Sequence, residues 1–298
     1  MNSERFHICV CFCTYKRPQL LDNLIKKLQN QRTDGLFTYS LLVVDNDHEQ
    51  SAKDMVTSHR QHSAVPIEYY CEPVKNIALA RNKAVKNAKG DFVAFIDDDE
   101  VPVDDWLLNL LNACNHYNAD GILGPVKPKF SMKPPTWVIK AKLFERPSYE
   151  TGTVLHWQNT RTGNVLLKRD IFEKSNNIFN PEFKHSEDQD FFRRMSEQGY
   201  VFIWCDEAIV YEIQTSDRFK KAYFLKRSLL RGNVSLRLQS SKFMPVIKSV
   251  IAFSLYTLAL PFLMMLSQHL FIKYLIKDFD HIGRLLAACK IDVQPYLS

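Results

Sequence analysis

Four consecutive acids, Asp97 to Glu100, directly follow an apolar run, Phe92 to Ile96. The run has the length and the β-branched or aromatic character of a buried strand. In an open α/β sheet, ligands bind just past the carboxyl ends of the strands. Four carboxylates at such a place repel one another unless a cation lies among them. A hard divalent cation, held by one or two carboxylates and by substrate phosphates, would relieve that repulsion. A solvated acidic turn is the alternative interpretation.

A second acidic pair, Glu187 and Asp188, follows Ser186 at the start of an expected helix that ends at Gly199. Acids favour helix N-termini through the helix dipole, by about 0.3–1 kcal/mol, so the pair could be purely structural. The alternative is that Asp188 is a general base. The same position keeps its carboxylate ionised near neutral pH, as a base requires.

Polar residues also follow the other expected strands. Strand 6–13 precedes Thr14, Tyr15 and Arg17, strand 41–44 precedes Asp45 and Asp47, and strand 67–71 precedes Asn76 and Arg81. Because the carboxyl ends of parallel strands meet at one edge of a sheet, these groups should converge on one site. That convergence favours a nucleotide site. Dinucleotide-fingerprint and P-loop readings are disfavoured, because neither Gly-x-Gly-x-x-Gly nor Gly-Lys-Ser/Thr is present.

Helical periodicity alternates with these strands. Apolar residues recur at helical spacing after Pro18, a polar helix is expected over 51–60, and further helices over 76–88 and 104–117. The order β-α-β-α-β-α-β predicts an α/β fold, with a mostly parallel, Rossmann-like sheet and helices on both faces. Residues 127–149 are rich in proline and aromatics without a clear period. They are expected to form a loop over a site.

The composition is that of a globular protein, with 298 residues, 46% hydrophobic residues and 24% charged residues. The net charge of +6 suits anionic partners such as nucleotides or a phospholipid surface, and no motif for nucleic acid accompanies it. Cys9, Cys11 and Cys13 alternate and should share one face of a strand. They are read as small buried side chains rather than a metal site, because one strand places thiols in a row. The seven cysteines fit a reducing, cytosolic environment.

Five motifs together resemble family-2 glycosyltransferases of the GT-A fold, in the family's order and at similar spacing. They are Cys-Thr-Tyr-Lys-Arg-Pro18, Val-Val-Asp-Asn46, Asn76-Ile-Ala-Leu-Ala-Arg-Asn82, Phe95-Ile-Asp-Asp-Asp99 and Ser186-Glu-Asp-Gln-Asp190. The resemblance covers about residues 6 to 213. Thr-Gly-Asn164 and the Arg218…Arg227…Arg231-Gly232 segment are similar to the bacterial polysaccharide subgroup of succinoglycan-type glucosyltransferases.

The resemblance implies an inverting transfer from a nucleotide-diphosphate sugar to a hydroxyl group, assisted by Mn²⁺ or Mg²⁺. By the family's pattern, Asp97 and Asp99 form the D-x-D motif, with Asp99 binding the metal directly, and Asp188 is the catalytic base. The implied substrate-binding residues are Thr14, Tyr15, Arg17, Asp45 for the base, Asn76, Arg81 for the ribose or phosphates, Asp97, Asn164 and Glu187.

Two departures from the family pattern stand out. Many relatives carry a metal-binding histidine after the last strand, where this chain has Tyr211 and Glu212. Glu212 either substitutes as an oxygen ligand or has no role in the site. The Q-x-x-R-W motif of processive synthases is absent, and Arg-Ser-Leu-Leu-Arg231 occupies its place. We therefore expect one sugar to be added per acceptor.

The C-terminal part differs in character. Residues 218–237 form a basic helical stretch, which is either a solvated face or a contact for an anionic membrane or phosphorylated acceptor. Ser249 to Ile272 contains no charged residue and reaches the roughly 20 apolar residues that cross a bilayer. Pro261 interrupts this run, so a kinked span, a shallow re-entrant hairpin and a buried core helix all remain open. A short amphipathic helix is expected over 280–291.

The expected organisation is therefore a GT-A domain over 1–215 and a helical, membrane-associated segment over 216–298, with the catalytic domain on the cytoplasmic side. The expected partners are a nucleotide-diphosphate sugar, a glycan or lipid-linked acceptor and the membrane, in cell-surface polysaccharide synthesis. Two alternatives remain. A nucleotidyltransferase would normally carry a glycine-rich phosphate loop after the first strand, and Thr-Tyr-Lys-Arg-Pro18 has no glycine. A catalytically inactive, membrane-bound nucleotide-sugar-binding protein would not need Asp97, Asp99 and Asp188 intact.

Overall fold

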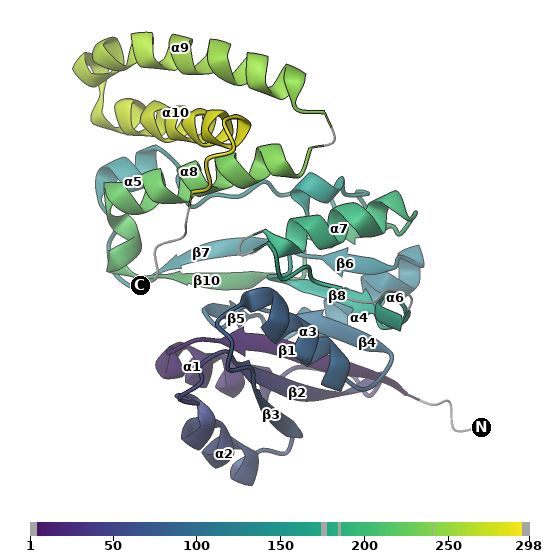
Figure 1. Ribbon diagram of the computed structural model, residues 1–298. Coiled ribbons are helices and arrows are strands. Elements are labelled where there is room, and N and C mark those ends of the chain that lie inside the picture. Colours follow the sequence, from purple (N-terminus) through teal and green to yellow (C-terminus); the bar gives the residue numbers. More distant parts are fainter. Residues whose placement is uncertain (1–4, 174–177, 184–185, 240, 294–298) are drawn as a thin grey trace. The chain divides into compact units, whose positions relative to one another are not determined.

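The computed structural model describes residues 5–173, 178–183, 186–239 and 241–293 (Figure 1). The chain forms two compact units. The first comprises Met1–Lys127 and Arg146–Ile213, and the second comprises Pro128–Glu145 and Gln214–Ser298. The expected domain 1–215 differs from the first unit mainly in one segment, because residues 128–145 group with the C-terminal residues.

The first unit is built on a seven-stranded sheet with the order β3-β2-β1-β4-β8-β6-β9. The strands are β1 (Phe6–Thr14), β2 (Phe37–Asp45), β3 (Ile67–Cys71), β4 (Phe92–Phe95), β6 (Gly121–Leu123), β8 (Val165–Lys168) and β9 (Phe202–Trp204). Strand β8 runs antiparallel to both of its neighbours, and the other pairs are parallel. The predicted mostly parallel sheet is confirmed.

Helices cover both faces of this sheet, as predicted (Figure 1). Helices α1 (Pro18–Leu28), α2 (Lys53–His62) and α4 (Trp106–Tyr117) pack on one face. Helices α3 (Ile77–Asn87), α6 (Asp170–Glu173) and α7 (Glu187–Glu197) pack on the other. A sheet buried on both faces explains why β1 and β4 read as continuous apolar runs rather than as alternating patterns.

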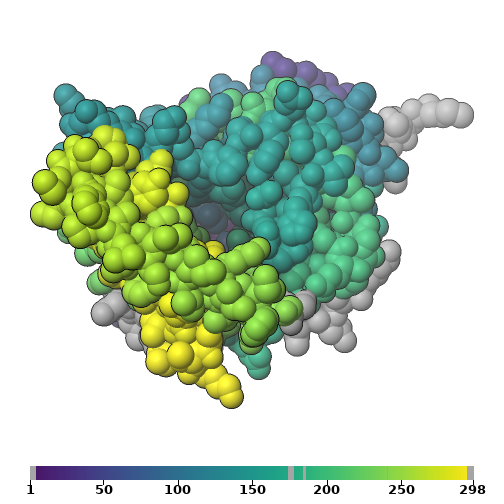
Figure 2. Space-filling model, turned by 90° about the horizontal axis from the view of Figure 1, so that it is seen from above, coloured from purple at the N-terminus to yellow at the C-terminus, as the bar shows by residue number. Residues whose placement is uncertain are grey.

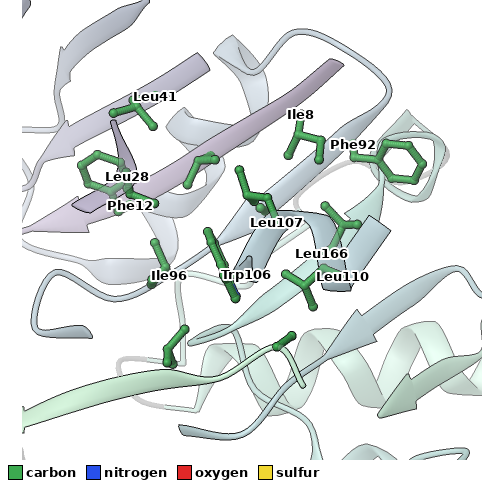
Figure 3. Close-up of a cluster of buried hydrophobic side chains, with 14 of the residues drawn as sticks. Ile8, Phe12, Leu28, Leu41, Phe92, Ile96, Trp106, Leu107, Leu110 and Leu166 are labelled. Carbon is green, nitrogen blue, oxygen red and sulfur yellow. The ribbon is translucent and has the colours of Figure 1, made fainter. Parts of the chain in front are cut away.

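Side chains of strand β1 point alternately into two hydrophobic cores, one on each face of the sheet. Ile8 and Phe12 point into the core beneath α1 and α4, where they meet Leu28, Trp106 and other apolar side chains (Figure 3). The buried thiols of Cys9 and Cys11 point to the opposite face, 3.8 Å apart. The described residues contain no group of three metal-ligating side chains. The reading of these cysteines as small buried side chains is therefore the one that the packing supports.

A smaller sheet has the order β5-β10-β7. Its strands are β5 (Glu100–Pro102), β7 (Val126–Phe130) and β10 (Val210–Gln214). Strand β5 begins inside the acidic run, a feature that the apolar pattern did not predict. It pairs antiparallel with β10, so that Glu100 lies opposite Glu212. The segment 127–149 was wrongly expected to be a loop throughout, since it contains part of β7 and a short helix, α5 (Thr136–Lys140).

The second unit is mainly helical. Besides α5 and a 3₁₀ turn (Ser216–Phe219), it contains α8 (Lys221–Arg237), α9 (Phe243–Leu266) and α10 (Gln268–Ala288). The apolar run 249–272 is not a single helix, because α9 ends at Leu266. Pro261 does not end this helix but lies within it. Helix α10 starts twelve residues earlier than the expected amphipathic helix, so the last part of the apolar run belongs to α10.

Two glycines allow α8 and α10 to pack closely. A Cβ atom on Gly232 would lie 1.9 Å from the carbonyl oxygen of Asp280, and one on Gly283 would lie 2.1 Å from that of Leu229. Between these contacts, Arg231 Nε donates to Asp280 Oδ1 at 2.7 Å and Asn233 Nδ2 donates to the Gly283 carbonyl at 3.3 Å. Backbone proximity and buried hydrogen bonds therefore fix the pairing of these helices.

We expect Gly232→Ala to destabilise the protein, because its added methyl group would overlap the backbone of α10. Overpacking of this kind costs about 1–3 kcal/mol in the free energy of unfolding. Ala222→Leu, which adds a larger group at an exposed position of the same helix, is the control and should have little effect. Chemical denaturation of both variants gives the comparison, and equal stability of the two would contradict the close packing.

Candidate functional site

The acidic run forms a tight turn at the end of β4. The backbone N–H of Asp97 donates to Glu100 Oε2 at 3.0 Å, and the N–H of Glu100 donates to the Asp97 carbonyl at 3.0 Å. Asp98, Asp99 and Glu100 are buried, whereas half of the Asp97 side chain is exposed. The turn therefore presents Asp97 most openly and holds the other three acids within the protein.

Residues at the end of β1 hold the middle of this turn. Thr14 Oγ1 donates to Asp98 Oδ2 at 2.8 Å, and Arg17 Nη1 lies 3.3 Å from Asp98 Oδ1 and 3.7 Å from Asp99 Oδ2. Burial nevertheless raises the pKa of Asp98 to about 6; Arg17 opposes that shift, and the nearby charge of Asp99 adds to it. The sequence placed Thr14 and Arg17 in the nucleotide pocket, and the structure shows that they also stabilise the acidic turn.

Two arginines that the sequence analysis missed surround Glu100. Burial and the charge of Asp97 raise the pKa of Glu100 well above its usual range. Glu212 lies opposite Glu100 on the neighbouring strand β10, and Arg146 Nη2 is 2.5 Å from Glu212 Oε2. Burial, and then the charge of Arg146, lower the pKa of Arg161 to about 10, while Glu100 and Asp188 raise it. Only Arg161 carried a sequence signal, since it directly precedes Thr-Gly-Asn164.

The second acidic motif joins the first through Arg81 of α3. The guanidinium group of Arg81 donates through Nη1 to Glu187 Oε1, and its Nη2 lies 3.5 Å from Asp97 Oδ1. Arg81 and Glu187 are both buried. The two motifs, which are far apart in the sequence, thus share one buried cation.

The turn at Thr162 and Gly163 also lies against both motifs. The Thr162 N–H contacts Asp188 Oδ2 at 3.5 Å. A Cβ atom on Gly163 would lie 2.9 Å from Asp97 Oδ2 and 2.8 Å from Glu100 Oε1, so only glycine fits there without a shift. Two adjacent residues of one turn therefore lie against Asp97 and Asp188, which brings the predicted metal ligand and the predicted base into one site.

Asn164 is held entirely by protein contacts. Its backbone has a φ of 70°, in the left-handed region that asparagine tolerates. Its side chain accepts a hydrogen bond from Trp106 Nε1 at 2.7 Å and donates to the carbonyls of Pro125 and Ala208 at 3.0 and 2.7 Å. It is fully buried. We therefore expect Asn164 to position the 162–163 turn, and the substrate contact that the family resemblance implies for it stays a prediction.

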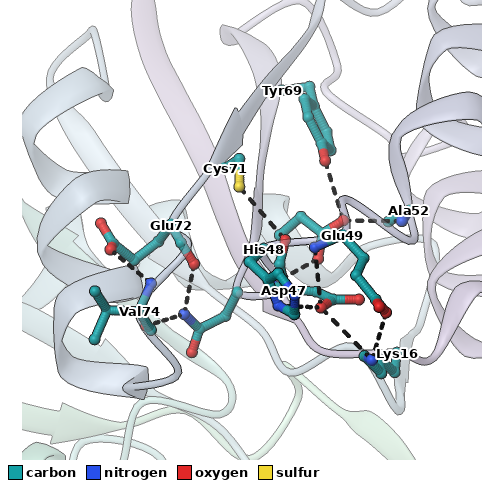
Figure 4. Close-up of polar contacts among 11 residues, drawn as sticks. Lys16, Asp47, His48, Glu49, Ala52, Tyr69, Cys71, Glu72 and Val74 are labelled. Atoms are coloured by element: carbon teal, nitrogen blue, oxygen red, sulfur yellow. Dashed lines mark hydrogen bonds and ion pairs between the residues drawn. The ribbon is translucent and has the colours of Figure 1, made fainter.

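The loop after β2 forms the other edge of the site (Figure 4). Asp45 is fully buried and accepts hydrogen bonds from the Ala52 N–H at 2.8 Å, the Asp47 N–H at 3.2 Å and the Tyr69 hydroxyl at 3.0 Å. Burial raises the pKa of Asp45. Its carboxylate is thus already engaged in shaping this loop, and a contact with the base of a nucleotide would require it to share these donors.

Two more predicted residues lie at this edge. Asn76 caps α3, accepting from the Ala78 N–H at 2.9 Å, and its Nδ2 donates to the Pro181 carbonyl at 2.9 Å. The ammonium group of Lys75 lies 4.1 Å from the centre of the Tyr15 ring. Asn76 therefore orients the helix that carries Arg81, and Tyr15 is the half-buried aromatic group of this edge.

The carboxylate oxygens of the site can be compared with the ligands that a divalent cation needs. Among the described residues, no three His, Cys, Asp or Glu side chains form a metal-binding group. Asp97 and Asp99 supply carboxylate oxygens, the ligands that Mg²⁺ and Mn²⁺ prefer, and Mg²⁺ is commonly held by one or two carboxylates together with substrate phosphates. The residues thus fit a cation that binds together with a diphosphate, with Asp97 and Asp99 as its protein ligands.

Replacing Asp98 tests the electrostatics of the turn. The pKa of about 6 in the folded protein, against 3.8 ordinarily, means that the folded state binds more protons between these values. Wild-type stability should therefore fall as the pH rises through this window, and Asp98→Asn lacks this effect. In the presence of a chelator, the unfolding free energy of the variant relative to wild type should rise by up to about 3 kcal/mol between about pH 4 and pH 7. Parallel pH profiles would contradict the burial of this charge.

Replacing Asn164 tests its positioning role. Asn164→Gly keeps the left-handed backbone but removes the partner of the Trp106 N–H and of the buried Ala208 carbonyl, while the Pro125 carbonyl keeps its bond from the Val210 N–H. Each unpaired buried group costs about 1–3 kcal/mol, so thermal unfolding should show a large loss of stability. The control is Asn118→Gly at an exposed position that also has a positive φ. Similar melting temperatures for the two variants would show that the contacts of Asn164 contribute little.

Comparison with known proteins identifies a family and several relatives that this chain resembles. Residues 9–177, more than half of the chain, match the family described as Glycosyl transferase family 2. The succinoglycan biosynthesis protein ExoM of Rhizobium meliloti (strain 1021) is 33% identical over 248 residues, and the match covers 81% of this chain and 78% of that protein. The glucosyl-dolichyl phosphate glucuronosyltransferase of Haloferax volcanii is 25% identical over 171 residues, which cover 55% of this chain and 53% of that protein.

Solved structures show the same fold. Residues 1–349 of S. aureus TarS in complex with UDP-GlcNAc superpose with a TM-score of 0.56 at 16% identity, covering 97% of this chain and 93% of that one. The UDP complex of the same TarS fragment gives a TM-score of 0.55 at 17% identity, with coverage of 95% and 91%. The family match and the relationship to ExoM, supported by the acidic motifs that meet at Arg81, show that this chain belongs to glycosyl transferase family 2.

Proposed function

We propose that this protein transfers one sugar, with inversion, from a nucleotide-diphosphate sugar to a hydroxyl group of a lipid-linked glycan during synthesis of a cell-surface polysaccharide. The observation that carries the proposal is the shared contact of Arg81 with Asp97 and Glu187, next to Asp188. It brings a carboxylate suited to a metal–diphosphate group and a carboxylate suited to proton abstraction to one site.

The donor side of the site is the edge formed by β1, β2 and α3. Thr14, Tyr15 and Arg17 lie at the end of β1 beside the acidic turn. The TarS fragment was solved with UDP and with UDP-GlcNAc, which supports a nucleotide-diphosphate sugar as the donor here. In the proposed complex, Asp97 and Asp99 hold Mn²⁺ or Mg²⁺ against the diphosphate. The bound cation would neutralise the charge that develops on the leaving group.

The chain's own residues prepare this side for the cation. Arg17 and Thr14 hold Asp98 and so fix the turn that carries both ligands. The hydrogen bond from the Asp97 N–H to Glu100 orients the backbone of Asp97. Arg81 partly offsets the charge of Asp97, since its Nη2 lies 3.5 Å from Asp97 Oδ1. Each of these contacts lowers the reorganisation needed when donor binds.

Asp188 is the proposed base. It lies in the first turn of α7, and its Oδ1 accepts the Gln189 N–H at 2.8 Å. As the acceptor oxygen attacks the anomeric carbon, Asp188 takes the hydroxyl proton. The new glycosidic bond forms on the face opposite the breaking bond to the diphosphate, which leaves as the nucleotide diphosphate. Inversion follows from this single displacement.

Two kinds of observation support a lipid-linked glycan as the acceptor, namely the apolar helix α9 and the names of two relatives. Helix α9 is long and apolar enough to cross a membrane by length and composition, and one relative is named for a dolichyl phosphate substrate. ExoM is named for succinoglycan biosynthesis, which supports a polysaccharide pathway. The seven free cysteines suit the reducing cytoplasmic side. Arg231, in the place of the processive motif, pairs with Asp280, in line with the addition of a single sugar.

Asp188→Asn and Asp99→Asn should separate the two halves of the proposed reaction. Asp188→Asn should bind a nucleotide diphosphate like wild type and lose about 10²–10⁴-fold in transfer rate, because only the base is removed. Asp99→Asn should weaken binding of the same nucleotide and abolish its strengthening by Mn²⁺. Calorimetry with a panel of nucleotide diphosphates, with and without Mn²⁺, and donor hydrolysis assays measure these effects.

An exposed carboxylate outside the site, Asp34, provides the matched control as Asp34→Asn. Binding that is retained in all variants, with no transfer or hydrolysis by wild type, would indicate a nucleotide-sugar-binding protein instead. A folded wild-type protein that binds no nucleotide diphosphate would refute the proposed donor site.

A further inference from the structure

Helix α9 carries an apolar stripe on its outer side. Its members follow one another at intervals of three, four or seven residues, which place them on one face of a helix. They are Met244, Ile251, Leu255, Leu258, Phe262 and Met265, and each is more than half exposed. Exposed Lys248 lies on the same face between Met244 and Ile251. The uninterrupted apolar part, from Ile251 to Met265, is about 21 Å long. In the space-filling view, no other described segment of the second unit covers the side of this helix that faces the viewer (Figure 2).

Several polar or aromatic side chains of α9 lie on the other side, next to α10, whereas Ser254 is exposed and donates to the Val250 carbonyl at 3.0 Å. Thr257 Oγ1 donates to Asp278 Oδ2 at 3.2 Å. The Tyr256 ring lies 5.5 Å from the ring of Tyr274 and 5.6 Å from that of His281. Ser249 is fully buried. The two sides of α9 are thus different, although the helix as a whole is apolar.

The partner helix prevents α9 from crossing a bilayer in this arrangement. Helix α10 lies along α9 and also packs on α8 through Gly232 and Gly283. If α9 spanned the membrane, α10 would have to run beside it through the hydrocarbon. Helix α10 carries charged groups over much of its length, at Lys273, Lys277, Asp278, Asp280 and Arg284. Such groups are costly at the centre of a bilayer.

We propose that α9 lies in the plane of an anionic phospholipid surface, with its outer stripe inserted among the acyl chains and α10 on the side away from the lipid. The protein would then bind one leaflet and not span the membrane. This inference makes the membrane association proposed above more specific. It does not depend on the transfer reaction, so its failure would leave the catalytic proposal standing.

Two observations favour lipid over a second copy of the chain as the occupant. From Ile251 to Met265 the members of the stripe offer no hydrogen-bonding side chain, whereas protein interfaces carry about one hydrogen bond per 100–200 Å². The charged residues of the segment 241–268 are Lys242 and Lys248, both exposed, with no acid among them. Lysines beside an apolar helical face are what attracts such a helix to anionic lipid.

Depth measurements test the orientation directly. A nitroxide label is attached to a cysteine introduced at position 244, 255 or 265, as Met244→Cys, Leu255→Cys or Met265→Cys. The background is the full chain with Cys289→Ser, because Cys289 is the exposed native cysteine. In vesicles of phosphatidylcholine and phosphatidylglycerol, an in-plane helix should give three similar depths of about 5–10 Å. A spanning helix would instead place the label at 255 near the bilayer centre and the other two near the interface, which would overturn the proposal.

Vesicle flotation gives an independent readout. Leu255→Glu combined with Leu258→Glu should reduce the vesicle-bound fraction at least tenfold, and Lys242→Gln with Lys248→Gln should remove the preference for anionic lipid. Leu36→Glu, at a comparably exposed apolar residue in the first unit, should leave binding unchanged. Circular dichroism checks that each variant is folded. Wild-type protein that does not float, or that forms dimers lost on the double Glu substitution, would assign the stripe to a protein contact instead.

Discussion

The concentration of negative charge at the end of β4 is the constraint to which the rest of the site responds. Three buried carboxyl groups and one half-exposed group occupy a single turn, where low polarity strengthens their repulsion. Arg17 and Thr14 offset the charge from one side, Arg81 offsets it from α3, and Arg146 and Arg161 lie near Glu100 and Glu212. Burial is the main cause of the raised pKa values of Asp98 and Glu100, and the charges of neighbouring acids add to it.

The need to balance opposite charges in the protein interior also accounts for the position of the second acidic motif. Arg81 is buried, and a buried guanidinium needs more than one carboxylate partner to repay its desolvation. Glu187 supplies one, and its helix thereby brings Asp188 to the acidic turn. Gly163 lets the chain pass close to Asp97 and Glu100, while Asn164 anchors that passage to Trp106 and two backbone carbonyls. Asp97 and Asp188, the proposed metal ligand and base, thus lie against a turn that Asn164 holds through hydrogen bonds.

In the second unit, helix α10 contacts both α8 and α9, and these contacts determine which side chains of α9 remain exposed. Helix α10 uses glycine contacts and the Arg231–Asp280 pair to lie against α8, and it takes up the polar side chains of α9. From Ile251 onward, what remains on the outside of α9 is mostly apolar. The surface of this unit therefore follows from helix pairing, since an apolar helix that buries its few polar groups must expose its hydrophobic ones.

The amino-acid sequence by itself determined the strand–helix alternation, the mostly parallel sheet, the polar rim and the two acidic motifs, because apolar periodicity and strand-end chemistry are local properties. The tertiary structure decided what those motifs touch. It inserted the antiparallel strand β8 beside β4, engaged Asp45 and Asn164 in protein contacts, and brought in Arg146 and Arg161. It also divided the apolar run 249–272 between α9 and α10. Such contacts join residues far apart in the chain, and they depend on which strands and helices pair, which no local pattern encodes.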